Sequence, residues 1–392
     1  MNPVSNPFAP GAGNQPPELA GRATILKDAS TAIQRAKLGK HSRSQMLLGL
    51  RGVGKTVLLN KIIDIAEEHG FLTSFIEAQE GYSLTKSLTQ KINQILQKLS
   101  LVEGAKEKCY SGLRALKSFA STFKISYGEL AISVNSEAGV ADSGELESDL
   151  SELFVRIGEA AQSAGKGWVL LIDEVQYLNA HDLGALIAAL HKVNQKQLPV
   201  IFFGAGLPQV AALSGNAKSY AERLFHYPSV GPLTKEDSNT AVNQPIVDEG
   251  MEISVEALEE IYQKTKGYPY FLQEWGYHCW QVCETERIDL TDAKAAEHIA
   301  TRVLDAGFFK VRFDRLTIKQ REYVIAMASL GKGPYYRSSD IADILGVTPE
   351  SLSPRRAEII GKGMVYSPSH GDIAFTVPLF DEYLTRNYPV TK

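Results

Sequence analysis

The sequence predicts an α/β fold, in which a parallel sheet flanked by helices is followed by a helical subdomain and a C-terminal winged helix-turn-helix. Two observations lead to this fold class. From Leu19 to about Leu233, short apolar runs without polar alternation are separated by segments with helical spacing, a pattern typical of strands buried on both faces. The length of 392 residues, with 44% hydrophobic and 22% charged residues, suits two or three domains and excludes a wholly disordered or fibrous chain.

Four apolar runs are the expected strands of the sheet. They are Gln45–Gly49, Phe71–Ile76, Trp168–Ile172 and Val200–Phe203. Helical spacing is clearest after the second run, where the apolar positions are Leu84, Leu88, Ile92, Ile95, Leu96 and Leu99. At about residues 124–140 the pattern changes to β-like alternation, which predicts a small hairpin inserted in the α/β core.

Composition and patterning divide the chain into four parts. Residues 1–18 are rich in proline, glycine and asparagine and are expected to form a flexible arm. Residues 19–234 hold the four strands and form the α/β core, and residues 235–310 carry mainly helical signals. Residues 311–392 have the pattern of three helices, a strand, a tight turn and a strand, which is the order of a winged helix-turn-helix.

The charges exclude a molecule that binds nucleic acid over its whole surface. The chain has a formal net charge of −4. Residues 311–392 contain 11 Lys and Arg against 9 Asp and Glu, a net charge of +2, so the remainder carries −6. Any contact with nucleic acid is therefore expected to be local and to involve the C-terminal part.

The three cysteines are too few for a disulfide framework and favour a reducing compartment. Cys279 and Cys283 can share a helix face with His278 beside them, but no second ligand pair is spaced to complete a metal site. Ordinary buried thiols are the simpler interpretation, for these two and for Cys109. The first 18 residues lack the pattern of a secretory signal, and no segment has the pattern of a membrane span. We expect a cytoplasmic protein.

The strongest motif lies between the first expected strand and a helical run. It is a complete phosphate-binding loop pattern, formed by Gly49, Leu50, Arg51, Gly52, Val53, Gly54, Lys55 and Thr56 and followed by Val57. Its glycines let backbone N–H groups turn toward phosphate oxygens at a helix N-terminus, where the helix dipole favours anions. The pattern predicts ATP or ADP binding on a P-loop NTPase sheet, with Lys55 at the β and γ phosphates and Thr56 as a ligand of Mg²⁺. The alternative is a chance match.

Two carboxylates follow the strand Trp168–Ile172. They are Asp173 and Glu174, at the carboxyl edge of the sheet where open α/β folds bind ligands. Asp173 is expected to hold hydrated Mg²⁺, and Glu174 to polarise a water for attack on the γ-phosphate. The alternative is a solvated acidic turn after a core strand. A protein that binds nucleotide without hydrolysing it is a further alternative, which the intact acidic pair disfavours.

With these motifs and the segment Leu19-Ala20-Gly21-Arg22, the chain resembles P-loop ATPases of the AAA+ and STAND groups. In particular it resembles the bacterial and archaeal ATPases related to the origin-recognition proteins, from about Leu19 to Leu384. The resemblance implies an ATPase core, a helical lid over residues 235–310 and a terminal winged helix. It also implies that Gly21 and Arg22 lie near the adenine, although Ala23 stands where many members carry Glu.

Two more site residues follow from the resemblance. Arg223 lies where similar ATPases carry an arginine finger, which acts on the nucleotide of a neighbouring subunit and implies an oligomer. The alternative is a surface arginine. Pro269 belongs to a Gly-x-Pro turn, Gly267-Tyr268-Pro269, with which lids of this kind approach the nucleotide. The alternative is an ordinary helix stop.

Two departures from the family pattern favour slow hydrolysis. The strand Val200–Phe203 runs into Gly204–Gly206, with no Asn, Ser or Thr at the usual sensor position. The helix expected over Tyr270–Val282 has no sensor arginine. A switch is therefore a better interpretation than a motor.

The expected winged helix has basic residues at places where such modules contact double-stranded DNA. They are Arg337, which precedes the second helix, and Arg355, Arg356 and Lys362 in the expected recognition helix. Because Glu350 and Glu358 lie among them, and because winged helices also bind proteins, a DNA partner and a protein partner both stay open.

The sequence favours a switch ATPase that binds Mg²⁺-ATP. Its nucleotide state is expected to control DNA engagement and oligomerisation, as a homo-oligomer or with a partner protein. The alternative is a nucleotide-dependent scaffold, in signalling or defence, whose winged helix contacts protein.

Overall fold

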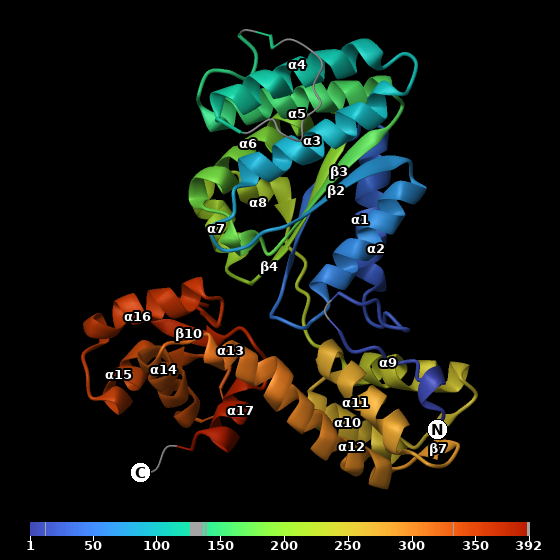
Figure 1. The fold of residues 1–392 in the computed structure, drawn as a ribbon, viewed down its shortest axis with the longest axis vertical. Helices are drawn as coiled ribbons and strands as arrows, with labels where there is room; N and C mark the ends of the chain where they lie inside the picture. The colour runs from blue at the N-terminus through green and yellow to red at the C-terminus, as the bar shows by residue number, and fades with distance from the viewer. Residues whose placement is uncertain (12, 126–135, 138, 332, 390–392) are drawn as a thin grey trace. The chain divides into compact units, whose positions relative to one another are not determined.

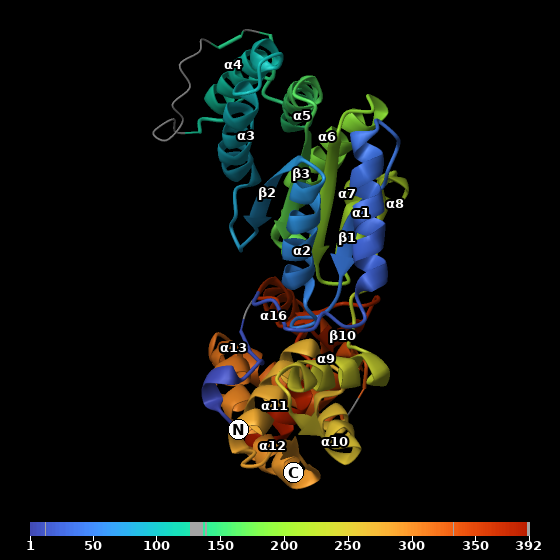
Figure 2. The same ribbon diagram turned by 90° about the vertical axis from the view of Figure 1, so that its right-hand side faces the viewer.

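The computed structural model describes residues 1–11, 13–125, 136–137, 139–331 and 333–389, which form two compact units (Figure 1, Figure 2). The sheet unit contains Thr24–Leu48 and Leu58–Ser229. The helical unit contains Met1–Ala23, Gly49–Val57 and Val230–Lys392. Each unit has its own hydrophobic core. The hairpin expected at about residues 124–140 lies mainly outside the described residues.

The sheet unit is built on five parallel strands in the order β2-β3-β4-β1-β5. The strands are β1 (Ser44–Leu48), β2 (Phe71–Glu77), β3 (Gly167–Asp173), β4 (Val200–Gly206) and β5 (Phe225–His226). Every residue of β3 and β4 is buried, as expected for strands covered on both faces. The predicted parallel sheet and its four expected strands are confirmed. The sequence does not predict β5, because two residues give no periodicity.

Helices cover both faces of this sheet (Figure 1). On one face lie α1 (Ala23–Lys37) and α2 (Lys55–Glu68), and on the other side lie α3 (Leu84–Ser100), α4 (Lys106–Thr122), α5 (Leu146–Ser163), α6 (Ala180–Gln195), α7 (Val210–Ala217) and α8 (Ala221–Leu224). Right-handed crossovers explain this division, because the chain moves one way along the sheet from β1 to β2 and the opposite way from β2 onward. The apolar stripe that predicted a helix is the buried face of α3.

The helical unit contains the predicted lid and the C-terminal part, and a single hydrophobic core runs through both. The first elements are α9 (Lys235–Asp248), β6 (Glu252–Ile253), α10 (Val255–Thr265), α11 (Pro269–Val282), β7 (Arg287–Ile288) and α12 (Leu290–Val303). A π-helical turn, η3 (Leu304–Phe309), then joins α12 to α13 (Lys310–Asp314). The domain boundary expected at residue 310 therefore falls inside a continuous helical segment.

The residues after α13 form the C-terminal module, defined here as Ile318–Asn387. Its elements are α14 (Ile318–Ser329), β8 (Tyr336–Arg337), α15 (Ser338–Leu345), α16 (Pro349–Gly361), β9 (Val365–Tyr366), β10 (Asp372–Phe375) and α17 (Phe380–Asn387). The three strands form an antiparallel sheet in the order β8-β10-β9. Gly371, with a φ of 82°, makes the tight turn that leads into β10.

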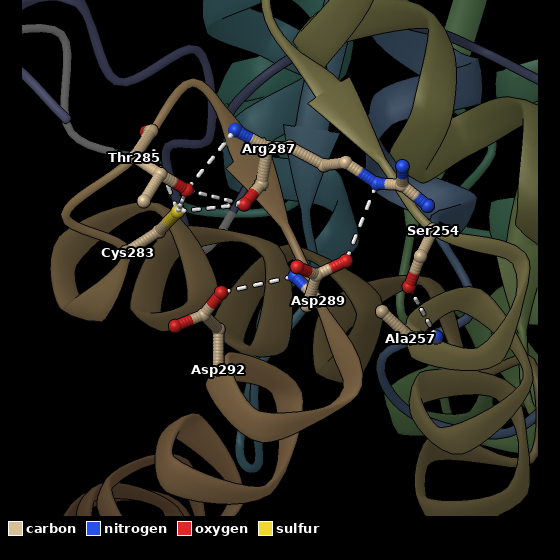
Figure 3. A network of polar contacts seen from close by, with 7 residues as sticks. All are labelled: Ser254, Ala257, Cys283, Thr285, Arg287, Asp289 and Asp292. Carbon is tan, nitrogen blue, oxygen red and sulfur yellow. Dashed lines mark hydrogen bonds and ion pairs between the residues drawn. The ribbon is translucent and has the colours of Figure 1, made fainter.

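Polar contacts fix the segment between α11 and α12 (Figure 3). The Cys283 Sγ lies 3.2 Å from the carbonyl oxygen of Arg287, to which the Thr285 hydroxyl also donates at 2.8 Å. At the start of α12, the Asp289 N–H donates to Asp292 Oδ2 at 2.9 Å, and the Arg287 Nε lies 3.2 Å from Asp289 Oδ1. All three cysteines are free and buried. Within the described ranges, no cluster of His, Cys, Asp and Glu is arranged to hold a metal ion, and no helix is long and apolar enough to cross a membrane.

The first residues of the chain pack against α11, whereas composition predicts a flexible arm. Phe8 is only 2% exposed, and a Cβ on Gly276 would stand 2.7 Å from its ring. The Trp280 indole N–H donates to the carbonyl oxygen of Asn2 at 2.7 Å. One buried ring and a hydrogen bond to a buried indole therefore anchor a segment whose composition alone favours an extended chain.

Replacing Phe8 with Ala is expected to destabilise the helical unit by about 3 kcal/mol, because a large buried ring leaves its site on α11. Val4→Ala is the matched control, since Val4 is 93% exposed. Urea unfolding of both variants and of the wild type measures the change. Equal unfolding midpoints for the two variants would contradict the anchored arm.

Candidate nucleotide-binding site

The predicted P-loop, Gly49–Val57, lies in the helical unit, and α2 begins within it at Lys55. Gly52 and Gly54 have φ values of 79° and 91°, in the left-handed region that glycine adopts without strain. No atom outside its own chain neighbours lies within 4 Å of the position that a Cβ on Gly54 would take. Among the described residues, the loop is therefore uncrowded at Gly54. That its N–H groups bind phosphate stays a prediction.

Lys55 is held along this loop. Its Nζ donates to the carbonyl oxygens of Gly49 at 2.9 Å and Leu50 at 2.8 Å, and the side chain is buried. Thr56, half-buried, follows in the first turn of α2. Gly49 tolerates no side chain, because a Cβ there would stand 2.0 Å from the carbonyl oxygen of Val230. The loop entrance thus packs directly on the segment that leads into α9.

Arg22 connects the N-terminal segment to the P-loop. Its guanidinium donates to the carbonyl oxygens of Val53 at 3.3 Å and Gly231 at 2.5 Å. Burial lowers the pKa of this guanidinium, and the charge of Asp237 opposes the shift. Gly21, with a φ of 68°, leaves room for Asp237, whose Oδ2 would lie 2.7 Å from a Cβ at that position. Arg22 therefore supports the loop backbone through Val53, and its predicted proximity to the adenine stays a prediction.

The predicted Gly-x-Pro turn also meets the P-loop. Pro269 is the first residue of α11, and the Tyr270 N–H donates to the carbonyl oxygen of Gly52 at 3.3 Å. Gly267 has a φ of 73°, and a Cβ on it would stand 2.3 Å from the carbonyl oxygen of Leu233. This close approach to Leu233 explains the glycine, whereas the Tyr270 N–H makes the contact of α11 with the loop.

Tyr270 links this contact to the π-helical turn η3. Its ring is stacked on Phe308, with 4.9 Å between the ring centroids, and its hydroxyl donates to Glu274 Oε1 at 3.2 Å. Burial and the neighbouring carboxylate raise the pKa of Tyr270 to about 12. The guanidinium of Arg312 covers the Phe308 ring, 4.0 Å from its centroid. A residue that touches the P-loop is therefore packed into the helical segment that leads to the C-terminal module.

The C-terminal module contacts the P-loop directly. The Arg51 N–H donates to the carbonyl oxygen of Thr376 at 3.0 Å, immediately after β10. Thr376 is fully buried, and its hydroxyl donates to the carbonyl oxygens of Gly363 at 2.7 Å and Met364 at 3.0 Å. Sequence reasoning misses both Thr376 and Tyr270, because a contact made by backbone atoms leaves no signature in residue type.

The predicted acidic pair lies at the end of β3, in the sheet unit. Asp173 is 4% exposed, and its Oδ1 accepts the N–H of Glu174 at 2.8 Å. Glu174 has φ 56° and ψ 42°, a left-handed conformation that is costly for a residue with a side chain. Such strain at a predicted catalytic residue is consistent with a functional position.

Gln176 is a residue of this region that the sequence analysis does not identify. Its side-chain amide donates to Glu174 Oε2, and its amide oxygen accepts the N–H of Leu207 at 3.1 Å. Leu207 directly follows β4. The last three residues of this strand, Gly204–Gly206, are buried and carry no polar side chain.

Arg223, the predicted arginine finger, lies on the short helix α8 of the sheet unit, just before β5. Its side chain is exposed. Its neighbours Ala221 and Leu224 are buried and hold the helix on the unit.

The four basic residues expected to contact DNA do not share one environment. Arg356 donates to Ser367 Oγ at 2.7 Å and to the carbonyl oxygen of Asp372 at 2.8 Å. Lys362 donates to the carbonyl oxygen of Arg315 at 2.9 Å. Both side chains are half-buried, and Lys362 also donates to Gln320 Oε1 at 2.8 Å. That these two residues contact DNA stays a prediction.

The other two basic residues have more open positions. Arg337 is exposed at the start of α15, and Arg355 is half-buried in α16. The acidic Glu350 and Glu358 are both exposed on α16, so the outer surface of this helix is not uniformly basic.

Comparison with known proteins agrees with the fold. Residues 18–203 match the AAA ATPase domain family, and residues 306–384 match a Domain of unknown function (DUF8462). The Walker-type ATPase PABY2304 of Pyrococcus abyssi is similar, with 16% identity, a TM-score of 0.57 and coverage of 93% of this chain and 96% of that one. No curated protein matches this chain.

Two further solved structures have lower TM-scores. The ORC1 protein of Aeropyrum pernix, solved in complex with DNA, has 13% identity, a TM-score of 0.46 and coverage of 96% of this chain and 95% of that one. A RuvB mutant of Thermotoga maritima has 16% identity, a TM-score of 0.46 and coverage of 94% and 96%.

Replacing Arg22 with Leu is expected to weaken ATP binding about tenfold, because the carbonyl oxygens of Val53 and Gly231 lose a charged donor and the loop loses its support. Arg35→Leu is the matched control, since the guanidinium of Arg35 donates to His41 at an exposed site. Calorimetric titration with ATP measures both. Wild-type affinity for ATP in the Arg22 variant would show that this residue does not support nucleotide binding.

Proposed function

We propose that this protein, whose residues 18–203 match the AAA ATPase domain family, is a nucleotide-controlled switch ATPase. The bound nucleotide determines the conformation of the helical unit and of its C-terminal module. The observation that carries the proposal is the hydrogen bond from the Arg51 N–H to the carbonyl oxygen of Thr376, at 3.0 Å. It joins the loop that is expected to hold phosphates to the module that is expected to meet a partner.

In this proposal the P-loop holds the phosphates of ATP or ADP. The backbone N–H groups at the start of α2 bind phosphate oxygens, and the Lys55 ammonium moves from its loop carbonyls to the β and γ phosphates. The open space beside Gly54 supports this role. Gly21 and Arg22 hold the loop from the side of the N-terminal segment.

Mg²⁺ fits the donors that the chain provides. Thr56 supplies a hydroxyl and Asp173 a carboxylate, and hard oxygen donors of this kind, completed by water and phosphate, are what Mg²⁺ prefers. When bound, the ion neutralises charge on the phosphates. Glu174 serves as the base that orients and polarises the attacking water. Lys55 then stabilises the negative charge that develops on the γ-phosphate.

The same features support slow turnover. The end of β4 offers no polar sensor side chain, and α11 contains no arginine that could act on the γ-phosphate. A nucleotide that persists for a long time is useful in a switch, because its state then lasts long enough to be read by a partner.

Hydrogen bonds of the P-loop can transmit its nucleotide-dependent conformation to the rest of the helical unit. Phosphate binding changes the hydrogen-bonding environment of Gly49–Val57. Thr376 and Tyr270 each share a backbone hydrogen bond with this loop, so the C-terminal module and α11 both respond to its conformation. The coupling requires differential contacts in the ATP and ADP states, which a binding measurement can detect.

The variants Lys55→Ala and Glu174→Gln test this function together. Lys55→Ala is expected to lose nucleotide binding, whereas Glu174→Gln is expected to bind ATP with wild-type affinity and to lose most turnover. Limited proteolysis then compares the C-terminal module in ATP and ADP. The cleavage pattern should differ between nucleotides in Glu174→Gln and stay constant in Lys55→Ala. Normal hydrolysis by Glu174→Gln would refute its assignment as the base.

The exposed position of Arg223 supports a second part of the proposal. We propose that Arg223 acts as an arginine finger on the nucleotide of a neighbouring copy in a homo-oligomer. The short helix α8 presents it at the surface, while the buried side chains of Ala221 and Leu224 fix that helix.

We further propose that the C-terminal module is a winged helix and that its partner is double-stranded DNA, contacted through Arg337 and Arg355. A specific observation favours a second candidate, a protein partner: Arg356 donates to Ser367 and Asp372, and Lys362 donates to Gln320, all within the module, which leaves fewer cations for phosphate contacts. Under the second candidate the protein is a nucleotide-dependent interaction scaffold.

A titration with duplex DNA at two salt concentrations separates these candidates. With two phosphate contacts, the logarithm of the binding constant is expected to fall with the logarithm of salt at a slope of about −2. The double variant Arg337→Ala/Arg355→Ala should abolish binding, while Arg287→Ala, an exposed arginine of the same unit, serves as control. The absence of DNA binding in both ATP and ADP would favour the protein partner.

A further inference from the structure

The side-chain amide of Gln176 connects two structural elements of the sheet unit. Gln176 lies in the 3₁₀ turn η2 (Val175–Tyr177) that follows Glu174. Its amide nitrogen donates to Glu174 Oε2, and its amide oxygen accepts the N–H of Leu207 at 3.1 Å. The amide has one orientation that satisfies both partners, because a flipped amide would set its oxygen against the carboxylate and its NH₂ against the Leu207 N–H.

Backbone contacts hold Glu174 itself in a demanding conformation. Its N–H is accepted by Asp173 Oδ1 at 2.8 Å, and its carbonyl oxygen accepts the N–H of Tyr177 at 3.0 Å. These bonds fix the backbone at φ 56° and ψ 42°, which a residue with a side chain adopts only when its surroundings impose it. The backbone bonds do not fix the rotation of the Glu174 side chain. The hydrogen bond from the Gln176 amide restricts its carboxylate.

The end of β4 is shaped to accept this amide. A Cβ on Gly206 would stand 2.7 Å from the amide oxygen of Gln176, so glycine leaves the space that the side chain occupies. The strand end therefore contributes a backbone N–H, from Leu207, in a region where its own side chains offer no polar group.

We propose that Gln176 is a positioning residue for ATP hydrolysis, which orients the Glu174 carboxylate by tying it to the carboxyl end of β4. The inference rests on the proposed function, in which Glu174 is the catalytic base. Gln176 acts through Glu174 and is not itself in contact with nucleotide. A base held in one orientation needs less reorganisation during attack by water, so loss of the amide slows the chemical step and leaves nucleotide binding unchanged.

Steady-state kinetics of the full chain test this role. Gln176→Met keeps the length of the side chain and removes both hydrogen bonds, and is expected to lower kcat about tenfold while KM stays within about twofold. Gln195→Met, an exposed glutamine on α6, is the matched control. A kcat within about twofold of the wild type in Gln176→Met, with Glu174→Gln inactive, would overturn the positioning role and leave the proposed function intact. Wild-type turnover in Glu174→Gln would instead overturn the proposed function.

A second pair of variants tests the same role without changing Gln176. Gly206→Ala crowds the Gln176 amide oxygen and also Val210 Cγ2, each 2.7 Å from the new Cβ, and is expected to lower kcat with KM unchanged. Gly215→Ala is its control, because no described residue outside the backbone of its own helix lies within 4 Å of a Cβ at that position. In the Glu174→Gln background, Gln176→Met should cause no further loss of residual turnover, since the residue acts through Glu174. A further loss by the same factor in that background would show a structural role and contradict the proposal.

Discussion

Hydrogen bonds to the backbone of the P-loop connect three separate parts of the helical unit. Three parts of this unit form hydrogen bonds with three successive loop residues: Thr376 with Arg51, Tyr270 with Gly52, and Arg22 with Val53. Each bond uses a backbone atom of the loop, so its conformation is shared with the N-terminal segment, the start of α11 and the C-terminal module. A loop that binds phosphate needs its backbone N–H groups to point toward the phosphate oxygens. In this loop, the hydrogen bonds with Thr376, Tyr270 and Arg22 fix the orientation of backbone groups.

Aromatic packing makes the helical unit a continuous body behind these bonds. From Tyr270, ring contacts run to Phe308, on to Phe309 in the same π-helical turn, and then to Tyr383 of α17, with ring centroids 4.9, 5.2 and 5.2 Å apart. Because this core is shared, the residues of the predicted lid and of the C-terminal module belong to one compact unit. We expect α11 and α17 to move together when the loop changes, since packed cores transmit displacement.

Contacts and sites that depend on particular side chains could be predicted from the sequence. Contacts made by backbone atoms could not. The glycines of the P-loop, the acidic pair and the buried strands each require particular residue types, so their patterns are visible. Thr376 meets the loop through a carbonyl oxygen, which every residue has. For Arg356, a basic residue on an expected recognition helix suggests a phosphate contact, and only the fold reveals its partners Ser367 and Asp372.

The most direct test is hydrogen exchange of the full chain carrying Glu174→Gln, in saturating ATP and in ADP. The account predicts that exchange of the Arg51 amide and of residues 364–377 differs by about tenfold between the two nucleotides, a coupling of ordinary size for linked sites. Residues 255–265, in α10, form no hydrogen bond to the loop among the described contacts and should change little. Identical exchange at Arg51 and residues 364–377 in both nucleotides, with the P-loop protected by each, would contradict the central claim that nucleotide state is read through the loop backbone.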